Sequence, residues 1–205
     1  MEPLLELADY RERVVALYRD GPQDGEDGWR DWRRRRDELL ATHPQSPLAA
    51  GARTDWFPYD PAAVVRTRPV PAEGELTVET GGEDGAVRYS RVARLETPYG
   101  PLTLFWLRQY GGGLFLPVRD GTSGAESYGG GRYLTDTAKG TFGRGLRLRA
   151  DGTAVLDFNY LYNPSCAYDA RWLCPLAPPE NRVDAPICAG ERLPIPTAVV
   201  EIRAP

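Results

Sequence analysis

Residues 102–119 read LTLFWLRQYGGGLFLPVR, and this stretch indicates the fold. Leu102, Leu104 and Trp106 alternate with other side chains, three glycines follow, and a second apolar run begins at residue 114. Alternation over a short run predicts a strand, and a glycine cluster predicts the turn that separates two strands. The stretch therefore predicts two neighbouring strands that run in opposite directions.

Similar short runs lie on both sides of this hairpin, separated by turn pairs such as Gly81-Gly82 and Asp151-Gly152. Eight or nine strands with short turns predict an antiparallel β-sandwich or a partly closed barrel. With two N-terminal helices, the expected fold class is mainly β (α+β). The expected strands are residues 62–68, 75–80, 87–96, 102–108, 114–119, 146–149, 154–158 and 198–203.

Two helices are expected before the first strand. Apolar residues recur at three- and four-residue steps from Leu7 to Tyr18, which predicts a short amphipathic helix that ends at residues 21–22. A second helix is expected after Asp27, ending at His43 because the residue before a proline avoids the helical region. We therefore expect residues 1–50 to form a helical arm packed on a β domain of residues 51–205, within one structural unit.

The second helix carries two overlapping patterns. Its inner stripe is expected to consist of apolar residues and one arginine at helical spacing. The arginines at 33–36 are also consecutive, and neighbouring acids favour a solvated face over a patch for nucleic acid or an acidic partner. The residues of the inner stripe are Trp29, Trp32, Arg36, Leu39 and Leu40.

Composition excludes several function classes. The net charge of −4 gives no basic footprint, so we expect no nucleic-acid partner. No apolar run approaches the length of a membrane span, and residues 1–20 do not resemble a signal peptide, so we expect a cytoplasmic protein without membrane association. The three cysteines are then expected to be reduced, and their odd number argues against a disulfide framework.

Polar residues concentrate first in residues 115–134, FLPVRDGTSGAESYGGGRYL. One interpretation is a hairpin whose polar residues satisfy the backbone of the turn. In the other, the three glycines let the backbone approach a ligand, while arginines bind a carboxylate or phosphate. The candidate ligand-binding residues here are Arg119, Ser123, Tyr128, Arg132 and Tyr133.

The second polar concentration covers residues 156–181, beginning LDFNYLYNPSCAYD. Asp157 and Asn159 are two apart and share one face of a strand. The segment predicts either a ligand site or a buried hydrogen-bond network that fixes a long irregular loop. Its candidate ligand-binding residues are Asn159, Tyr162, Asn163, Tyr168, Glu180 and Asn181.

Together with the HPQSP of residues 43–47 and the FPYDP of residues 57–61, these segments resemble a widespread prokaryotic family known only as a domain of unknown function. The family pattern reads approximately HPxSP, FPxDP, PFRDxTSGxxTYGGGRYL, DFNxAYNPxCAY and CPLPPxEN, and the match spans about residues 29–191. This chain departs from it at Val118, Gly121, Ser127 and Ala177. The resemblance strengthens the choice of site residues and implies no activity.

Two kinds of chemistry remain as alternatives at these segments. Cys166, Cys174 and His43 supply metal ligands or a nucleophile, but their spacing is unlike that of structural zinc sites, so we expect neither a metal nor a cofactor. Asp120, Glu126 and Asp157 are the candidate acid and base of a hydrolase.

We therefore expect a small-molecule binding domain with an anionic ligand. Its pocket mouth is expected to be formed by the glycine-rich hairpin and the loop of residues 157–176. The alternatives are a hydrolase that uses carboxylates in the same pocket and a non-catalytic protein-interaction domain in which both segments are braces and the arm docks a partner.

Overall fold

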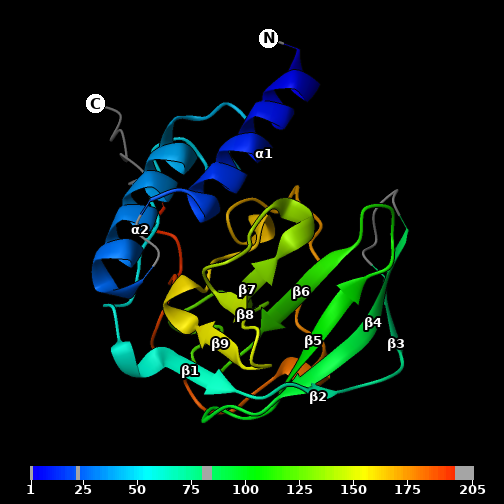
Figure 1. The fold of residues 1–205 in the computed structure, drawn as a ribbon. Helices are drawn as coiled ribbons and strands as arrows, with labels where there is room; N and C mark the ends of the chain where they lie inside the picture. Colours follow the sequence, from blue (N-terminus) through cyan, green and yellow to red (C-terminus); the bar gives the residue numbers. More distant parts are fainter. Residues whose placement is uncertain (1, 22–23, 80–84, 197–205) are drawn as a thin grey trace, which may run out of the picture.

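A computed structural model describes residues 2–21, 24–79 and 85–196. The chain begins with two helices, α1 (Pro3–Arg19) and α2 (Gly25–Thr42), which pack side by side at one end of a β domain (Figure 1). Their positions confirm the two predicted helices. Neither helix is long and apolar enough to cross a membrane.

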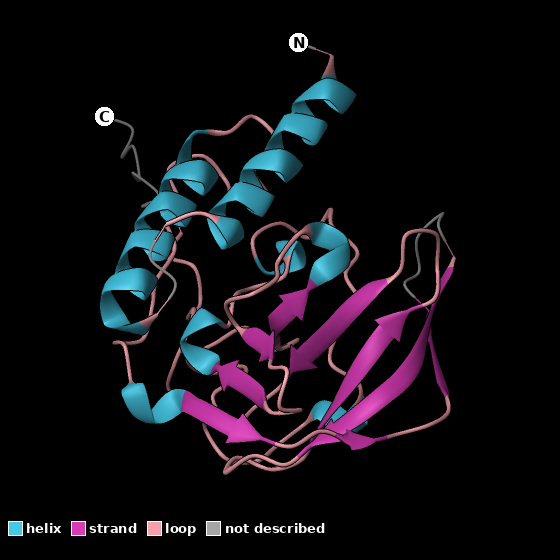
Figure 2. Ribbon diagram, viewed as in Figure 1, coloured by secondary structure: helices cyan, strands magenta, loops and turns pink. Residues whose placement is uncertain are grey.

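The larger sheet has six antiparallel strands in the order β2-β4-β5-β6-β7, with β3 also pairing with β4 (Figure 2). The ten-residue strand β4 pairs with β2 near its end and with β3 near its start, and its pairing with β5 is interrupted by a bulge between Arg91 and Ala93. The strands are β2 (Val70–Pro71), β3 (Glu75–Glu79), β4 (Ala86–Leu95), β5 (Leu102–Leu107), β6 (Gly113–Val118) and β7 (Arg132–Asp136).

A smaller antiparallel sheet has the order β1-β9-β8. Its strands are β1 (Val64–Thr67), β8 (Leu146–Leu148) and β9 (Ala154–Asp157). Short 3-10 turns complete the structure: η1 (Pro61–Ala63), η2 (Thr137–Lys139), η3 (Phe158–Tyr160), η4 (Ser165–Ala167) and η5 (Pro179–Asn181). The described residues form a sandwich-like α+β fold without a closed barrel, as the sandwich alternative predicted.

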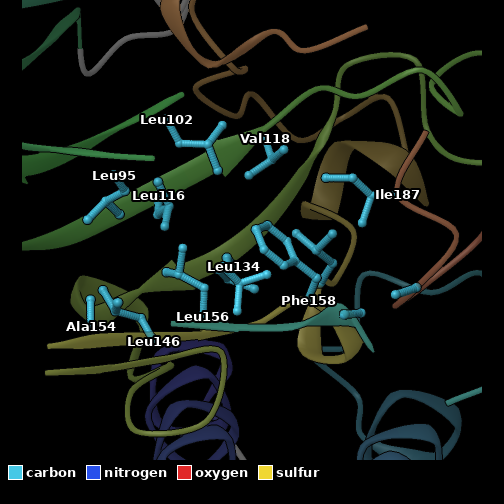
Figure 3. Close-up of a cluster of buried hydrophobic side chains, with 14 of the residues drawn as sticks. Leu95, Leu102, Leu116, Val118, Leu134, Leu146, Ala154, Leu156, Phe158 and Ile187 are labelled. Atoms are coloured by element: carbon cyan, nitrogen blue, oxygen red, sulfur yellow. The ribbon is translucent and has the colours of Figure 1, made fainter. Parts of the chain in front are cut away.

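The apolar core lies between the two sheets (Figure 3). Leu104 and Leu116 come from the larger sheet and Leu156 from the smaller one, and all three are almost completely buried. At about 25 cal/mol per Å² of apolar surface, each buried leucine stabilises the fold by about 1.5–3 kcal/mol. Alternation along the strands therefore produces one shared core.

The helical arm joins the β domain through an aromatic cluster. Trp32 is completely buried, and its ring meets the rings of Trp56 and Tyr160 at centroid distances of 5.4 and 4.9 Å. The indole N–H of Trp29 donates to the carbonyl of Asn159 at 2.9 Å. Arg144, also buried, donates to the carbonyl of Leu17 at the end of α1. These contacts fix the arm over one end of the sandwich.

Strand β7 (Arg132–Asp136) was not among the expected strands. Its five residues are all buried and pair with β6, as the hairpin interpretation of residues 115–134 allows. The expected strand at residues 198–203 lies outside the described residues.

Candidate functional site

The first polar segment is organised around a buried ion pair. The guanidinium of Arg132 lies 2.7 Å from the carboxylate of Asp120, and both side chains are completely shielded from solvent. Arg132 also donates to the carbonyls of Ile187 and Ala189, and Asp120 accepts from the N–H of Ile187. Burial raises the pKa of Asp120, but Arg132 and the bonds from Thr122 hold it below its ordinary value. The pair thus ties β7 to the segment 187–191.

The glycine run lets the backbone at Gly131 lie close to the backbone of β6. Gly131 has a φ of +91°, and a Cβ there would lie 2.7 Å from the carbonyl oxygen of Val118 on β6. A residue with a side chain would be strained and would clash at this position. Ser123 accepts from the N–H of Asp120 within the same turn, and Arg119 is half-buried with its backbone bonded to Asn181 and Val183. These contacts match the hairpin interpretation.

Asp157 and Asn159 share a buried network, as their spacing suggested. Asn159 donates to the carboxylate of Asp157 at 2.9 Å and exchanges hydrogen bonds with the backbone N–H and carbonyl of Asp60. Burial raises the pKa of Asp157 above its ordinary value. The network closes the end of β9 against the segment before η1.

Asn181 is a second brace. Its side chain is completely buried, accepts from the N–H of Thr103, and donates to the carbonyls of Thr103 and Pro117. The neighbouring Glu180 instead lies near the surface in an ion pair with Arg91 at 2.8 Å. Binding of a ligand by these residues stays a prediction, and their described contacts are structural.

A cavity of about 310 Å³ lies where the helical arm meets the β domain. The arm contributes apolar side chains such as Leu7, Val14 and Leu39, and the β domain contributes Tyr133 from β7. The loop that follows η3 completes the wall. From this loop come Tyr162, Asn163, Pro164, Ser165, Tyr168, Trp172, Leu173 and Cys174.

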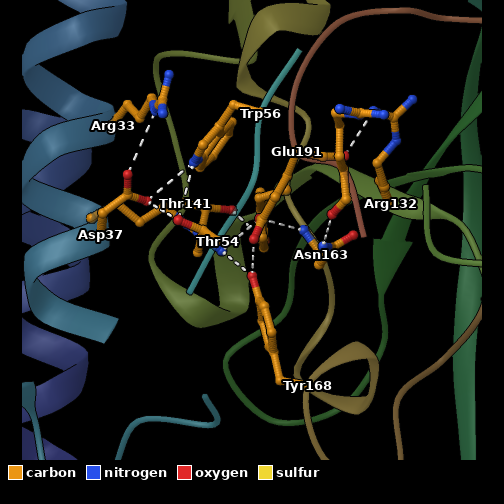
Figure 4. Close-up of polar contacts among 12 residues, drawn as sticks. Arg33, Asp37, Thr54, Trp56, Arg132, Thr141, Asn163, Tyr168 and Glu191 are labelled. Carbon is orange, nitrogen blue, oxygen red and sulfur yellow. Dashed lines mark hydrogen bonds and ion pairs between the residues drawn. The ribbon is translucent and has the colours of Figure 1, made fainter. Parts of the chain in front are cut away.

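Part of this wall belongs to a buried polar network (Figure 4). Arg36 of α2 lies 3.1 Å from the carboxylate of Glu191 and donates to the hydroxyl of Tyr168. Glu191 also accepts from the hydroxyl of Tyr168 and from the N–H of Asn163. Burial raises the pKa of Glu191, and Arg36 opposes that rise. The network joins the arm to the chain's last described segment.

Four residues that line the cavity each carry a buried polar atom with no hydrogen-bond partner within the described parts of the chain. These atoms are Tyr18 Oη, Arg36 Nη1, Asn163 Oδ1 and Trp172 Nε1. The amide of Asn163 is oriented by its Nδ2, which donates to the carbonyl of Arg192 at 2.7 Å, so the unpartnered atom is an acceptor. Buried polar groups are nearly always satisfied, and a group of unsatisfied atoms at one cavity requires an explanation.

The charge of the lining is one-sided. Arg11, Arg36 and Lys139 are among the lining residues, and no aspartate or glutamate is among the described residues that line the cavity. Glu191 neutralises Arg36 from behind, and Lys139 lies 3.8 Å from Asp136. Arg11 donates to the carbonyl of Ala138 and is exposed, so it carries a positive charge at the rim of the cavity.

The structure gathers only part of the predicted site at this cavity. Tyr133, Tyr162, Asn163 and Tyr168 line it, as does Cys174. The candidate carboxylates Asp120, Glu126 and Asp157 are not among its lining residues, and Glu126 is exposed. Neither are Arg119, Ser123, Tyr128, Arg132, Asn159, Glu180 and Asn181.

Sequence reasoning missed the contribution of the arm, chiefly Tyr18 and Arg36. The signal for Arg36 was its place on the inner stripe of the second helix, between Trp32 and Leu39. The prediction of a solvated face for residues 33–36 is wrong for Arg36, whose side chain is only 9% exposed. It is right for Arg34, which is 65% exposed.

The candidate metal ligands lie apart. His43 is bonded to Asp9 at 3.0 Å and accepts from the N–H of Gln45, so it joins α1 to the end of α2. Cys166 and Cys174 line one groove, which His43 does not line. Among the described residues there is no group of three or more side chains of the types that bind metal ions.

Comparisons with known proteins identify relatives without an assigned activity. A family model described as "Protein of unknown function (DUF1684)" matches residues 52–192, beginning after the helical arm. An uncharacterized protein of Haloarcula marismortui, solved by solution NMR, is similar, with 30% sequence identity and a TM-score of 0.54. That similarity covers 80% of this chain and 91% of the other. No curated protein matches the chain.

Proposed function

The chain belongs to the DUF1684 family of proteins of unknown function, and we propose that it binds a small anionic molecule with an apolar body in the cavity beneath its helical arm. The observation that carries the proposal is that three residues lining one cavity carry unpartnered buried atoms, Tyr18 Oη, Arg36 Nη1 and Asn163 Oδ1. An unsatisfied buried polar atom costs about 1–3 kcal/mol, so a ligand that completes these atoms gains that energy on binding.

The atoms specify the polar end of the ligand. Arg36 Nη1 and the hydroxyl of Tyr18 can donate to the oxygens of a carboxylate, and Asn163 Oδ1 accepts from a ligand hydroxyl or N–H. Leu7, Val14 and Leu39 supply the apolar wall for the rest of the molecule. A volume of about 310 Å³ is at the lower end of the range for small-molecule sites, roughly 300–1,000 Å³.

The positive lining favours an anion over a neutral or cationic ligand. Arg11 adds charge at the rim, while the ion pair with Glu191 holds Arg36 in place. We also propose that the protein is cytoplasmic, as its sequence predicts. A hydrolytic role has less support, because the three candidate carboxylates do not line the cavity.

A matched ligand series tests the proposal. Octanoate, octanol and octylamine share a body and differ in the head, and each is added at increasing concentration while the melting temperature is recorded. We expect octanoate to raise the melting temperature with concentration, since a ligand that binds only the native state stabilises it by mass action. Octanol should have a smaller effect and octylamine the smallest.

A variant that fills the cavity is the control. Leu7→Trp adds volume to the partly buried wall formed by α1, so it should fold and lose the response to octanoate. Equal effects of octanoate and octylamine on the wild-type protein would disprove an anion site. An octanoate response that persists in Leu7→Trp would place binding elsewhere.

A further inference from the structure

Two cysteines, Cys166 and Cys174, form a second group of reactive side chains. Cys166 lies in η4 and Cys174 lies in the loop before η5, and each is partly exposed. Each thiol is the main influence on the other's pKa, and the hydroxyl of Tyr128 donates to the sulfur of Cys166 at 3.6 Å. Two thiols that interact directly and line one groove are candidates for a disulfide.

Both thiols are accessible from an open groove. The groove has a volume of about 680 Å³ and is lined by Cys166, Cys174 and Tyr128, together with strand β3. Cys174 lines the smaller cavity as well, so it lies in the wall between the two. A small oxidant can therefore reach the pair without opening the core.

The surroundings stabilise one sulfur as an anion. Cys166, the backbone N–H groups of Ser165 and Cys166, and the positive charge of Lys139 all favour the thiolate form of Cys174. These groups outweigh burial and lower the pKa of Cys174 to about 6. The pKa of Cys166 is raised, first by Cys174 and then by burial. Charged and titratable groups facing Cys174 thus include Cys166, Lys139 and Tyr133.

We propose that Cys166 and Cys174 form a reversible dithiol–disulfide pair that reacts with peroxides, with Cys174 as the attacking thiol and Cys166 as the resolving thiol. The sulfur of Cys174 attacks one peroxide oxygen, the O–O bond breaks, and Cys174 becomes a sulfenic acid while the peroxide is reduced to water or an alcohol. The thiol of Cys166 then attacks the sulfenic sulfur and water leaves. Two thiols and one peroxide give one disulfide, one water and one further water or alcohol.

The proposal is independent of ligand binding in the cavity. It rests on the groove that both partly exposed thiols line, on the contact of Tyr128 with Cys166 and on the influence of each thiol on the other's pKa. The third cysteine provides an internal control, because Cys188 is exposed and lies outside the lining of both spaces.

Peptide mass spectrometry tests the pair in the intact protein. The reduced chain is treated with one equivalent of hydrogen peroxide, blocked with iodoacetamide and digested with trypsin. Arg171 lies between the two cysteines, so cleavage after Arg149, Arg171 and Arg182 gives separate peptides, residues 150–171 and 172–182. We expect these peptides to be joined by a disulfide that dithiothreitol releases, with Cys188 recovered as the alkylated thiol. Alkylation of all three cysteines after peroxide would overturn the proposal.

Two variants assign the roles. In Cys166→Ser, Cys174 should stop at the sulfenic acid, which dimedone traps on the peptide of residues 172–182. In Cys174→Ser, Cys166 should give at least tenfold less dimedone adduct, whereas Cys188→Ser should form the disulfide as the wild type does. Equal trapping at Cys166 and Cys174 would reject the assigned roles. If a serine variant does not fold, the order of iodoacetamide labelling in the wild-type protein decides: Cys174 before Cys166 supports the assignment, and the reverse overturns it.

Discussion

Arg132 and Asp120 form an ion pair of 2.7 Å in which neither side chain is exposed, and each partner also bonds to the backbone of residues 187–191. The two residues belong to the segment that the sequence suggested as a ligand site. Their contacts connect strand β7 to residues 187–191, so we expect the pair to stabilise the fold.

Replacing Arg132 should strongly destabilise the fold. Arg132→Ala leaves Asp120 buried without its partner, and breaking a buried pair in this way costs about 3–5 kcal/mol. Denaturant unfolding monitored by tryptophan fluorescence measures the change. Arg119→Ala, on the same hairpin but half-buried, is the matched control and should change the unfolding free energy by less than about 1 kcal/mol. An Arg132→Ala protein as stable as the wild type would contradict the bracing role.

Neighbouring residues 180 and 181 provide a second matched pair. Asn181→Ala leaves three backbone groups without the hydrogen bonds that the buried side chain makes to them. The variant should therefore lower the free energy of unfolding by about 2–4 kcal/mol. Glu180→Ala removes a partly exposed ion pair with Arg91 and should cost less than about 1 kcal/mol. Chemical denaturation of both variants gives the comparison, and equal losses would refute the assignment of Asn181 as the brace.

Removing the hydroxyl of Tyr18 should separate stability from binding. Tyr18→Phe deletes a buried hydroxyl without a partner, so the free protein should keep its stability or gain up to about 1 kcal/mol. The same change should reduce the melting-temperature increase caused by octanoate. Tyr89→Phe is the control, because Tyr89 stacks on Phe115 outside the cavity lining. A full octanoate response in Tyr18→Phe would exclude this hydroxyl from the site.

The pH dependence of stability should respond to Asp136. Burial raises the pKa of Asp136 in the folded state. A raised folded pKa means that the native state binds the proton more tightly, so this contribution is complete below the unfolded pKa and is lost as pH rises through the folded pKa. We expect Asp136→Asn to reduce the loss of stability as pH rises above about 4, the unfolded pKa, measured by unfolding at each pH. Parallel wild-type and variant curves would contradict this.

The reactivity of Cys174 should follow its own titration. The pKa of about 6 predicts that iodoacetamide labels Cys174 at half its maximal rate near that pH. Lys139→Gln removes a positive charge that lowers the pKa of Cys174, so it should shift the labelling curve to higher pH. Peptide mass spectrometry follows the rate, and a curve for Cys174 that coincides with that of Cys188 would reject the assigned environment.

Local pattern was sufficient for most of the fold. The two helices and the hairpin of residues 102–119 followed from periodicity and from the glycines between the runs. Strand β7 did not, because Arg132 and Tyr133 after three glycines were compatible with a hairpin and with a ligand segment. Both side chains are buried. Arg132 lies in its ion pair with Asp120, and the hydroxyl of Tyr133 donates to the carbonyl of Pro175.

The candidate site was only partly predictable for a related reason. Tyr162, Asn163 and Tyr168 are close in sequence, and their polar density indicated that they belong together. Tyr18 and Arg36 complete the cavity from a part of the chain more than 120 residues away, and no local pattern encodes that approach. The same holds for Arg132, whose partners at residues 187–191 follow it by more than 50 residues.

The bond between Arg36 and Glu191 also bears on how the protein is made. A ribosome releases the arm first, and the carboxylate that neutralises Arg36 emerges only 155 residues later. Until then the guanidinium must stay in water, because an unpaired charge is too costly to bury. Contacts so distant in sequence slow folding through the entropy of closing the intervening chain. The arm can consequently complete its contacts with the rest of the chain only after residue 191 has been synthesised.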